Sequence, residues 1–138
     1  MTQREIADFV WLRWPPFRTD NIIKIIDWYA SHKLLGVVTD NGAIQAVATI
    51  RIVNSKEEGL EHYKHDPNGN MIWVDLIASD TKIATAALVT MLFENWGKKQ
   101  YVGFQKSLRS THVHVFPSRL LDKVLQRSVT AGLVTHRS

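Results

Sequence analysis

The stretch that decides the fold is Met71–Trp96, MIWVDLIASDTKIATAALVTMLFENW. Its first residues alternate between two largely apolar faces, which predicts a buried strand over Met71–Ala78. A polar turn at Ser79–Thr81 follows and predicts the start of a long apolar helix that reaches about Lys98. A strand that leads directly into a helix presents unpaired backbone N–H groups at the helix start. This stretch therefore predicts a place where an anion would bind.

Strand and helix patterns follow one another along the rest of the chain, with no linker, internal repeat or low-complexity tract. We therefore expect a single domain over residues 1–138. The dipeptide Asn41-Gly42 lies between two apolar runs, a pattern typical of a β-hairpin. The other expected elements are, in order, a helix Thr2–Leu12, a helix from Thr19 or Asp20 to His32, strands Leu34–Thr39 and Ala43–Val53, a short helix around Ser55–His62, a strand Thr111–Phe116, a helix Arg119–Arg127 and an edge strand around Gly132–Thr135.

The segment after the long helix fits two interpretations. Tyr101, Phe104 and Leu108 recur at helical spacing, which favours a helix over Lys99–Leu108. The competing interpretation is a strand, Gln100–Phe104. With either interpretation, the order of elements predicts an α/β fold with a mixed central sheet flanked by helices.

The composition excludes several classes of protein. The apolar fraction of 45% and the charged fraction of 22% are ordinary for a globular domain with a buried core. Because there is no cysteine, the chain has no disulfide and no thiolate nucleophile or metal ligand. No apolar run reaches the roughly 18 residues of a membrane span, and the first residues lack the pattern of a secretory signal. We therefore expect a cytoplasmic protein.

The net charge of +4 lies largely in the second half of the chain. Such an excess suits a nucleic acid, a phosphate-bearing ligand or an acidic partner, and a solvated basic face is the ordinary alternative. Aromatic rings at Tyr101 and Phe104 lie among these cations, a combination that would suit single-stranded nucleic acid. The basic residues concerned are Lys98, Lys99, Lys106, Arg109, Arg119, Lys123, Arg127 and Arg137.

Tryptophan is frequent, with five residues, and two of them lie beside a pair of prolines. Full burial of Trp11 and Trp14 is difficult so close to Pro15-Pro16. Because exposed tryptophan is enriched at interfaces, these two residues predict contact with a protein partner or a second copy of the chain.

Two histidines, His112 and His114, fall on one face of an expected strand, a spacing that can chelate a metal ion. A metal site needs at least a third ligand, and the polar segment containing His62, His65 and Asp66 is the only obvious source. We therefore predict no metal site.

The order of elements over about Thr19–Arg127 resembles the GNAT family of acyl-CoA-dependent N-acyltransferases. In that family the start of the long helix carries the motif Gln or Arg, two residues, Gly, one residue, and Gly or Ala, whose amides hold the CoA pyrophosphate. The best register here is Thr81-Lys82-Ile83-Ala84-Thr85-Ala86. The resemblance therefore implies acetyl-CoA as the cofactor, with Thr81, Lys82, Ala84 and Ala86 as binding residues, although threonine begins the motif and no glycine is present.

The resemblance also implies a carboxylate on a central strand that deprotonates the amine substrate, and Asp75 has that position. Desolvation beside Trp73 and Ile77 would make this carboxylate more basic, which suits the role. The structural alternative is an ion pair between Asp75 and either Arg51 or Lys82.

Two further features of the family have no counterpart in this chain. The tyrosine that protonates the departing thiolate is missing from Arg119–Arg127, and Phe116-Pro117 stands where an asparagine is usual. These departures favour a degenerate GNAT-like domain that acts as a structural or binding module. Short chains of this kind occur in bacteriophage genomes, which implies a role in a phage particle or another assembly. The alternative is an active acetyl-CoA-dependent N-acyltransferase.

Overall fold

The computed structural model of the chain describes residues 1–13, 20–97, 99–105, 113–121 and 133–137. Within these residues, six strands form one sheet in the order β5-β4-β3-β2-β1-β6. Only β3 and β4 are parallel neighbours; the other pairs are antiparallel. The strands are β1 (Leu35–Asp40), β2 (Ala43–Val53), β3 (Met71–Ser79), β4 (Tyr101–Gln105), β5 (Val113–Pro117) and β6 (Leu133–Arg137). The predicted α/β fold with a mixed central sheet is therefore confirmed.

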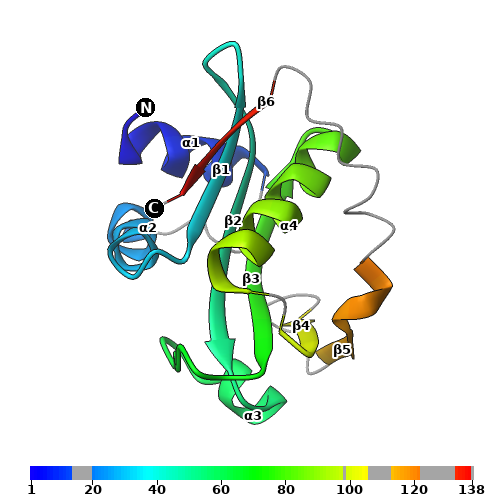
Figure 1. Cartoon of the computed structure of the whole chain (residues 1–138). Coiled ribbons are helices and arrows are strands. Elements are labelled where there is room, and N and C mark those ends of the chain that lie inside the picture. Colours follow the sequence, from blue (N-terminus) through cyan, green and yellow to red (C-terminus); the bar gives the residue numbers. More distant parts are fainter. Residues whose placement is uncertain (14–19, 98, 106–112, 122–132, 138) are drawn as a thin grey trace.

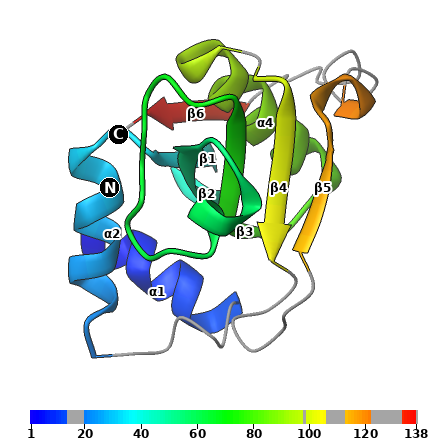
Figure 2. The ribbon, with the colours of Figure 1, turned by 90° about the horizontal axis from the view of Figure 1, so that it is seen from below.

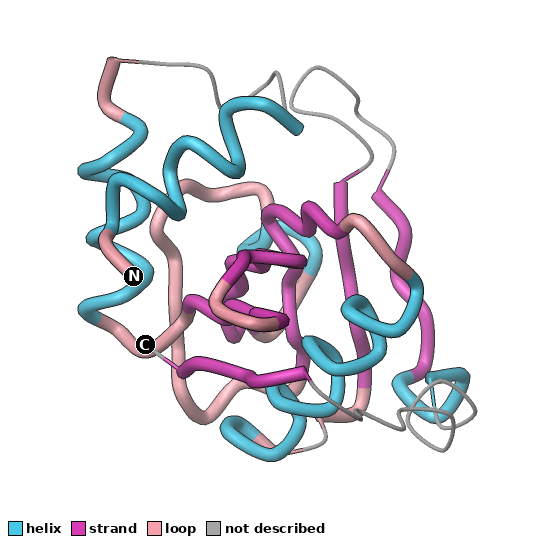
Figure 3. The backbone as a smooth tube through the Cα atoms, turned by 90° about the horizontal axis from the view of Figure 1, so that it is seen from above, coloured by secondary structure: helices cyan, strands magenta, loops and turns pink. Residues whose placement is uncertain are grey.

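Helices cover both faces of this sheet (Figure 1). Helices α1 (Gln3–Arg13) and α2 (Ile22–Ser31) lie against one face, and α4 (Lys82–Trp96) lies against the other (Figure 2). The view from above shows the same three layers, with strands between two groups of helices (Figure 3). One cluster of buried apolar side chains joins both helical layers to β1, β2 and β3. None of the helices in the described ranges is long and apolar enough to cross a membrane.

Local signals explain the elements before the long helix. Thr2 Oγ1 accepts a hydrogen bond from the Glu5 amide and caps α1. The Asn41-Gly42 turn connects β1 to β2, and both residues have positive φ angles of 51° and 82°, as such hairpin turns require. Ser55 caps the short helix α3 (Lys56–Gly59) by accepting from the Glu58 amide.

Helix α4 begins and ends at residues that explain its bounds. Thr81 caps its amino end, and Gly97, with φ 76°, follows its last residue. Gly36 on β1 lets the helix approach the sheet, because a Cβ there would lie 2.2 Å from Cε of Met91. The helix therefore packs directly against the strand through its leucine and methionine side chains.

The helix expected over Lys99–Leu108 is wrong in its described part, where the chain forms strand β4 instead. Residues 101–104 pair in parallel with β3, from Met71↔Tyr101 to Val74↔Phe104. The helical spacing of the aromatic residues was overridden because Gly97 ends α4 and the sheet offers the unpaired edge of β3. Residues 106–112 lie outside the described part of the chain.

The C-terminal elements agree with expectation where the structure describes them. A short 3-10 helix, η2 (Ser118–Leu121), begins at the position predicted for the last helix, whose remainder, 122–127, lies outside the described residues. The expected edge strand is present as β6, which pairs antiparallel with β1 at the edge far from β5.

Candidate functional site

A buried ion pair connects the two central strands. Asp75 lies at a β-bulge, because Thr49 is opposite Leu76 and Ile50 is opposite Val74, which leaves Asp75 without a cross-strand neighbour. Arg51 Nε donates to Asp75 Oδ2 at 2.8 Å, and Nη2 donates to Oδ1 at 2.9 Å. The side chain of Arg51 is only 4% exposed and that of Asp75 only 15%. The pair therefore has the bidentate geometry that suits a guanidinium and a carboxylate away from water.

The chain uses every N–H donor of the Arg51 guanidinium. Besides the two bonds to Asp75, Nη1 donates to the carbonyl oxygens of Glu61 and Lys64. Nη2 also donates to the carbonyl oxygen of Gly59. One side chain therefore holds together strands β2 and β3, helix α3 and the segment that connects α3 to β3.

A tyrosine completes the site from the helical layer. Tyr29 Oη on α2 donates to Asp75 Oδ2 at 2.7 Å. Burial raises the pKa of the Tyr29 phenol well above its usual range, and the neighbouring Asp75 carboxylate raises it further. Burial alone would lower the pKa of Arg51, but its bonds to Asp75 and the charge of that carboxylate leave it raised. Both groups therefore remain proton donors to Asp75 across the physiological range of pH.

The structure thus contains the Arg51 ion pair that was the alternative interpretation of Asp75. Three donors converge on this carboxylate, so its oxygens are engaged by the protein itself. Its role as a catalytic base stays a prediction. The contribution of Tyr29 was missed, because in the sequence this residue simply completes the apolar face of a helix.

Polar groups of the strand-to-helix turn, Ser79–Thr81, also form hydrogen bonds within the chain. Thr81 Oγ1 accepts from the Ala84 amide at 3.0 Å, one of the first-turn N–H groups that an anion would use. The Thr81 carbonyl oxygen accepts from Ser79 Oγ at 2.7 Å. Asp80 forms a bidentate pair with Arg13 of α1, at 2.8 and 3.0 Å, and the bonds from Arg13 lower the pKa of this carboxyl group. A carboxylate and its own counter-ion therefore lie beside the helix start.

The four predicted CoA-binding residues divide into two groups. Thr81 and Lys82 lie exposed at the turn, where the sequence placed them. Ala84 and Ala86 are 0% and 6% exposed, so their side chains are enclosed by the fold. Because these alanines are buried, their small size already serves the close packing of α4, whether or not a ligand binds.

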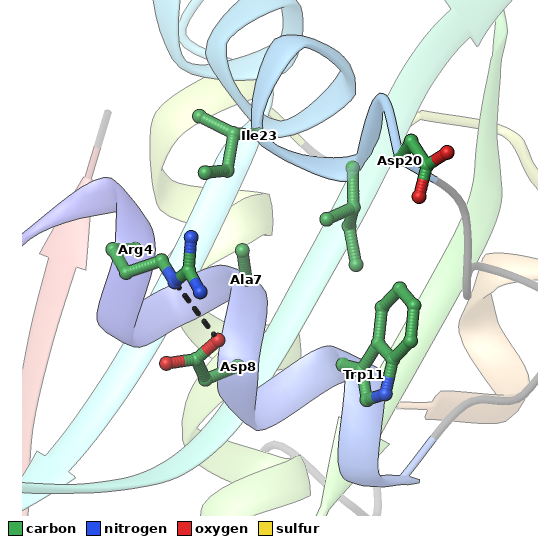
Figure 4. A pocket seen from close by; sticks show the side chains of 7 residues that line it. Arg4, Ala7, Asp8, Trp11, Asp20 and Ile23 are labelled. Carbon is green, nitrogen blue, oxygen red and sulfur yellow. Dashed lines mark ion pairs between the residues drawn. The ribbon is translucent and has the colours of Figure 1, made fainter.

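Two surface grooves are lined by described residues. One, of about 340 Å³, lies between α1 and α2 and includes Trp11, which is 39% exposed (Figure 4). Arg4 and Asp8 form an ion pair of 3.3 Å on its α1 side. Trp14, the second tryptophan predicted at an interface, lies outside the described residues.

The second groove, of about 500 Å³, lies at the start of β4 and the end of β5. Its charged lining residues are the cations Lys99 and Arg119, and Tyr101 also lines it, a combination that suits an anion. His114 of β5 stacks on Phe104 with ring centroids 5.0 Å apart, while His112 lies outside the described residues. Among the described residues, no three His, Cys, Asp or Glu side chains are grouped as a metal site would require.

Comparisons with family models, with curated proteins and with solved structures find no match to this chain.

Proposed function

We propose that this chain is a degenerate GNAT-like domain that acts as a structural or binding module and not as an acyltransferase. The observation that carries the proposal is the state of Asp75. Its carboxylate is engaged by the bidentate Arg51 guanidinium and by the Tyr29 hydroxyl. A general base must receive a proton from its substrate, and a carboxylate held by three donors is poorly placed to do so.

The helix start supports the same proposal. A CoA pyrophosphate would need the first-turn amides, yet the Ala84 amide already donates to Thr81 Oγ1. The carboxylate of Asp80 adds negative charge beside this turn, and Arg13 neutralises it within the protein. Most of the residues that the family resemblance assigns to catalysis and cofactor binding therefore have a role in the fold itself: Asp75 in the ion pair, Thr81 as a helix cap, and Ala84 and Ala86 in close packing.

The contact surface of such a module would be the groove between α1 and α2. Trp11 is at one end of it, and the adjacent Leu12 is 70% exposed. An exposed tryptophan that lines a surface groove is typical of a protein interface. We propose that this surface contacts a second copy of the chain or another protein of an assembly such as a phage particle.

The first test is the thermal stability of the full chain with and without acetyl-CoA at about 1 mM. We expect no change in melting temperature, whereas a ligand at about 100 times its dissociation constant would add about 2.7 kcal/mol, or several degrees. A matched variant is Ile83→Glu, because Ile83 lies in the first turn of α4 and is 55% exposed. A rise in melting temperature that Ile83→Glu abolishes would instead support the acetyl-CoA-dependent N-acyltransferase.

The second test is sedimentation equilibrium over a range of protein concentrations. We expect self-association that Trp11→Ala weakens at least several-fold, because that change removes a large apolar contact. Leu60→Ala is the control, since Leu60 is 48% exposed but follows α3, away from the groove. A chain that stays monomeric at every concentration and forms no stable complex would contradict the proposal.

A further inference from the structure

The segment 60–66, here called the strap, belongs to the long connection between α3 and β3 (Figure 2). It covers the edge of β2 at Ile52, where β2 has no neighbouring strand on that side among the described residues. Strand β1 pairs with β2 only as far as Thr49. Beyond that point the Ile52 amide donates to His65 Nδ1 at 3.0 Å, and the Ile52 carbonyl oxygen accepts from the Asp66 amide at 2.7 Å. The strap therefore takes the place of a neighbouring strand along the last part of β2.

The same segment closes over the buried ion pair. Two of its carbonyl oxygens, those of Glu61 and Lys64, accept from Arg51. Its aromatic rings contact two helices: the ring centroids of Tyr63 and Trp28 lie 4.7 Å apart, and those of His65 and Trp96 lie 5.4 Å apart. Tyr63 also has a φ of 60°, in the left-handed region that is unfavourable for a tyrosine. The strap is thus held against this backbone strain by its bonds to Arg51 and Ile52 and by the bond from Asn54 Nδ2 to Asp66 Oδ2 at 3.0 Å.

One of these bonds depends on the protonation state of a histidine. A backbone N–H can only donate, so His65 Nδ1 must be unprotonated to accept from Ile52. If Nδ1 gains a proton, two donors face each other and the bond is lost. Without this bond, the neighbouring hydrogen bond from the Asp66 amide to the Ile52 carbonyl oxygen would no longer be held in register.

We propose that the strap is an acid-sensitive cover, and that protonation of His65 releases residues 60–66 from β2 and exposes the Arg51–Asp75 pair. The proposal concerns a conformational change of the fold and does not depend on whether the chain is a module or an enzyme.

The electrostatic surroundings of His65 set the direction of this response. Burial is the largest cause that lowers the pKa of His65 below its ordinary value of 6.5. Positive charge on His32, the residue after α2, and on Arg51 of β2 lowers it too. Asp66, within the strap, acts in the opposite direction, and α4 presents the uncharged Trp96. Because the pKa is lowered in the closed form, closure is fully stabilised above pH 6.5 and weakens as the pH falls through the lower value.

The test is amide hydrogen exchange of the full chain by NMR, expressed as protection factors so that the intrinsic dependence on pH is removed. From about pH 7.5 to 5.5, we expect the protection factors of the Ile52 and Asp66 amides to fall roughly tenfold. At about one pH unit below its ordinary pKa, a histidine in the released strap is protonated in a ratio of about 10 to 1, which favours the open form by that factor. The amides of Val47 and Ala48, where β2 is paired on both sides, should keep their protection.

Three variants separate this mechanism from general acid sensitivity. His65→Asn places an amide oxygen near the position of Nδ1 and cannot titrate, so its strap should respond little to pH. His62→Asn is the matched control, because His62 lies in the same strap and is exposed, and this variant should respond as the wild type does. His32→Gln removes a group whose charge disfavours protonated His65 in the closed form, so the protection of its Ile52 amide should fall less between about pH 7.5 and 5.5 than in the wild type.

Several outcomes would overturn the proposal. They are the absence of any fall in the wild type, an equal fall in His65→Asn, or an equal fall at Val47 and Ala48, which would mean global unfolding. A direct measurement on the wild type remains decisive if a variant does not fold. The titration of the His65 ring, followed by its nitrogen chemical shifts, must have its midpoint below the ordinary pKa of 6.5, and the protection of Ile52 must fall between these two pH values.

Discussion

Replacing Arg51 with methionine is expected to destabilise the protein by about 3–5 kcal/mol, the range seen when one partner of a buried ion pair is removed. The variant leaves the Asp75 carboxylate, only 15% exposed, without its counter-ion. It also removes the donor from the carbonyl oxygens of Gly59, Glu61 and Lys64. At about 3–4 °C per kcal/mol for a domain of this size, the melting temperature should fall by about 10–20 °C. Urea denaturation of the wild type and the variant measures the difference directly.

A double-mutant cycle shows whether the loss comes from the pair. Arg51→Met together with Asp75→Leu removes both charges, and we expect it to be clearly more stable than Arg51→Met alone, because no unpaired charge remains buried. Arg51→Lys should be intermediate, since an ammonium keeps the charge but lacks the planar fork. A loss below about 1 kcal/mol in Arg51→Met would mean that the pair is solvated like a surface ion pair. Asp75 would then not be needed for stability, which would count against a purely structural role.

The sequence predicted those parts of the fold that depend on neighbouring residues. The bounds of β2, the turn at Asn41-Gly42 and the start of the long helix at the polar turn Ser79–Thr81 all follow from residues within a few positions of one another. Helix α4 lies where its apolar run predicts it, although its apolar residues spread around the whole helix. The spread fits a helix that packs against several strands of the sheet.

The error at β4 has a clear physical cause. Tyr101 and Phe104 satisfy a helical spacing and also a strand, because five residues are too few to distinguish the two periods. What decides between them is the unpaired edge of β3, which is supplied by residues about 30 positions earlier in the chain. No window around residue 101 contains that information.

The candidate site was accessible from the sequence only in part. The pairing of Asp75 with Arg51 could be proposed because both lie on neighbouring strands. The β-bulge at Asp75 and the hydroxyl of Tyr29, 46 residues earlier, could not, since they depend on how α2 packs on the sheet. The backbone carbonyl oxygens of the strap carry no side-chain signal at all. The site therefore became recognisable as a structural network only in three dimensions.

Replacing Gly59 with alanine is expected to cost about 3 kcal/mol of stability, at the upper end for overpacking a core. A Cβ at this position would lie 2.2 Å from Cε3 and 2.3 Å from Cδ2 of Trp73, and a rigid indole that is 1% exposed has no room to move away. The displaced backbone would also carry the Gly59 carbonyl oxygen away from Arg51 Nη2. Thermal and urea unfolding measure the loss.

Gly103→Ala is the matched control, because its Cβ would approach the same indole from β4. The distance to Cε3 would be 2.9 Å, a less severe contact, so we expect a loss of about 1 kcal/mol of stability. Trp73→Phe removes the ring atoms that both alanines would meet. Combined with Gly59→Ala, it should therefore destabilise less than the sum of the two single changes. If the two changes are additive, the indole is not the obstacle. The cost of Gly59→Ala must then come from the lost hydrogen bond to Arg51. In that case Gly59→Ala should cost little in the Arg51→Met background, where this bond is already absent.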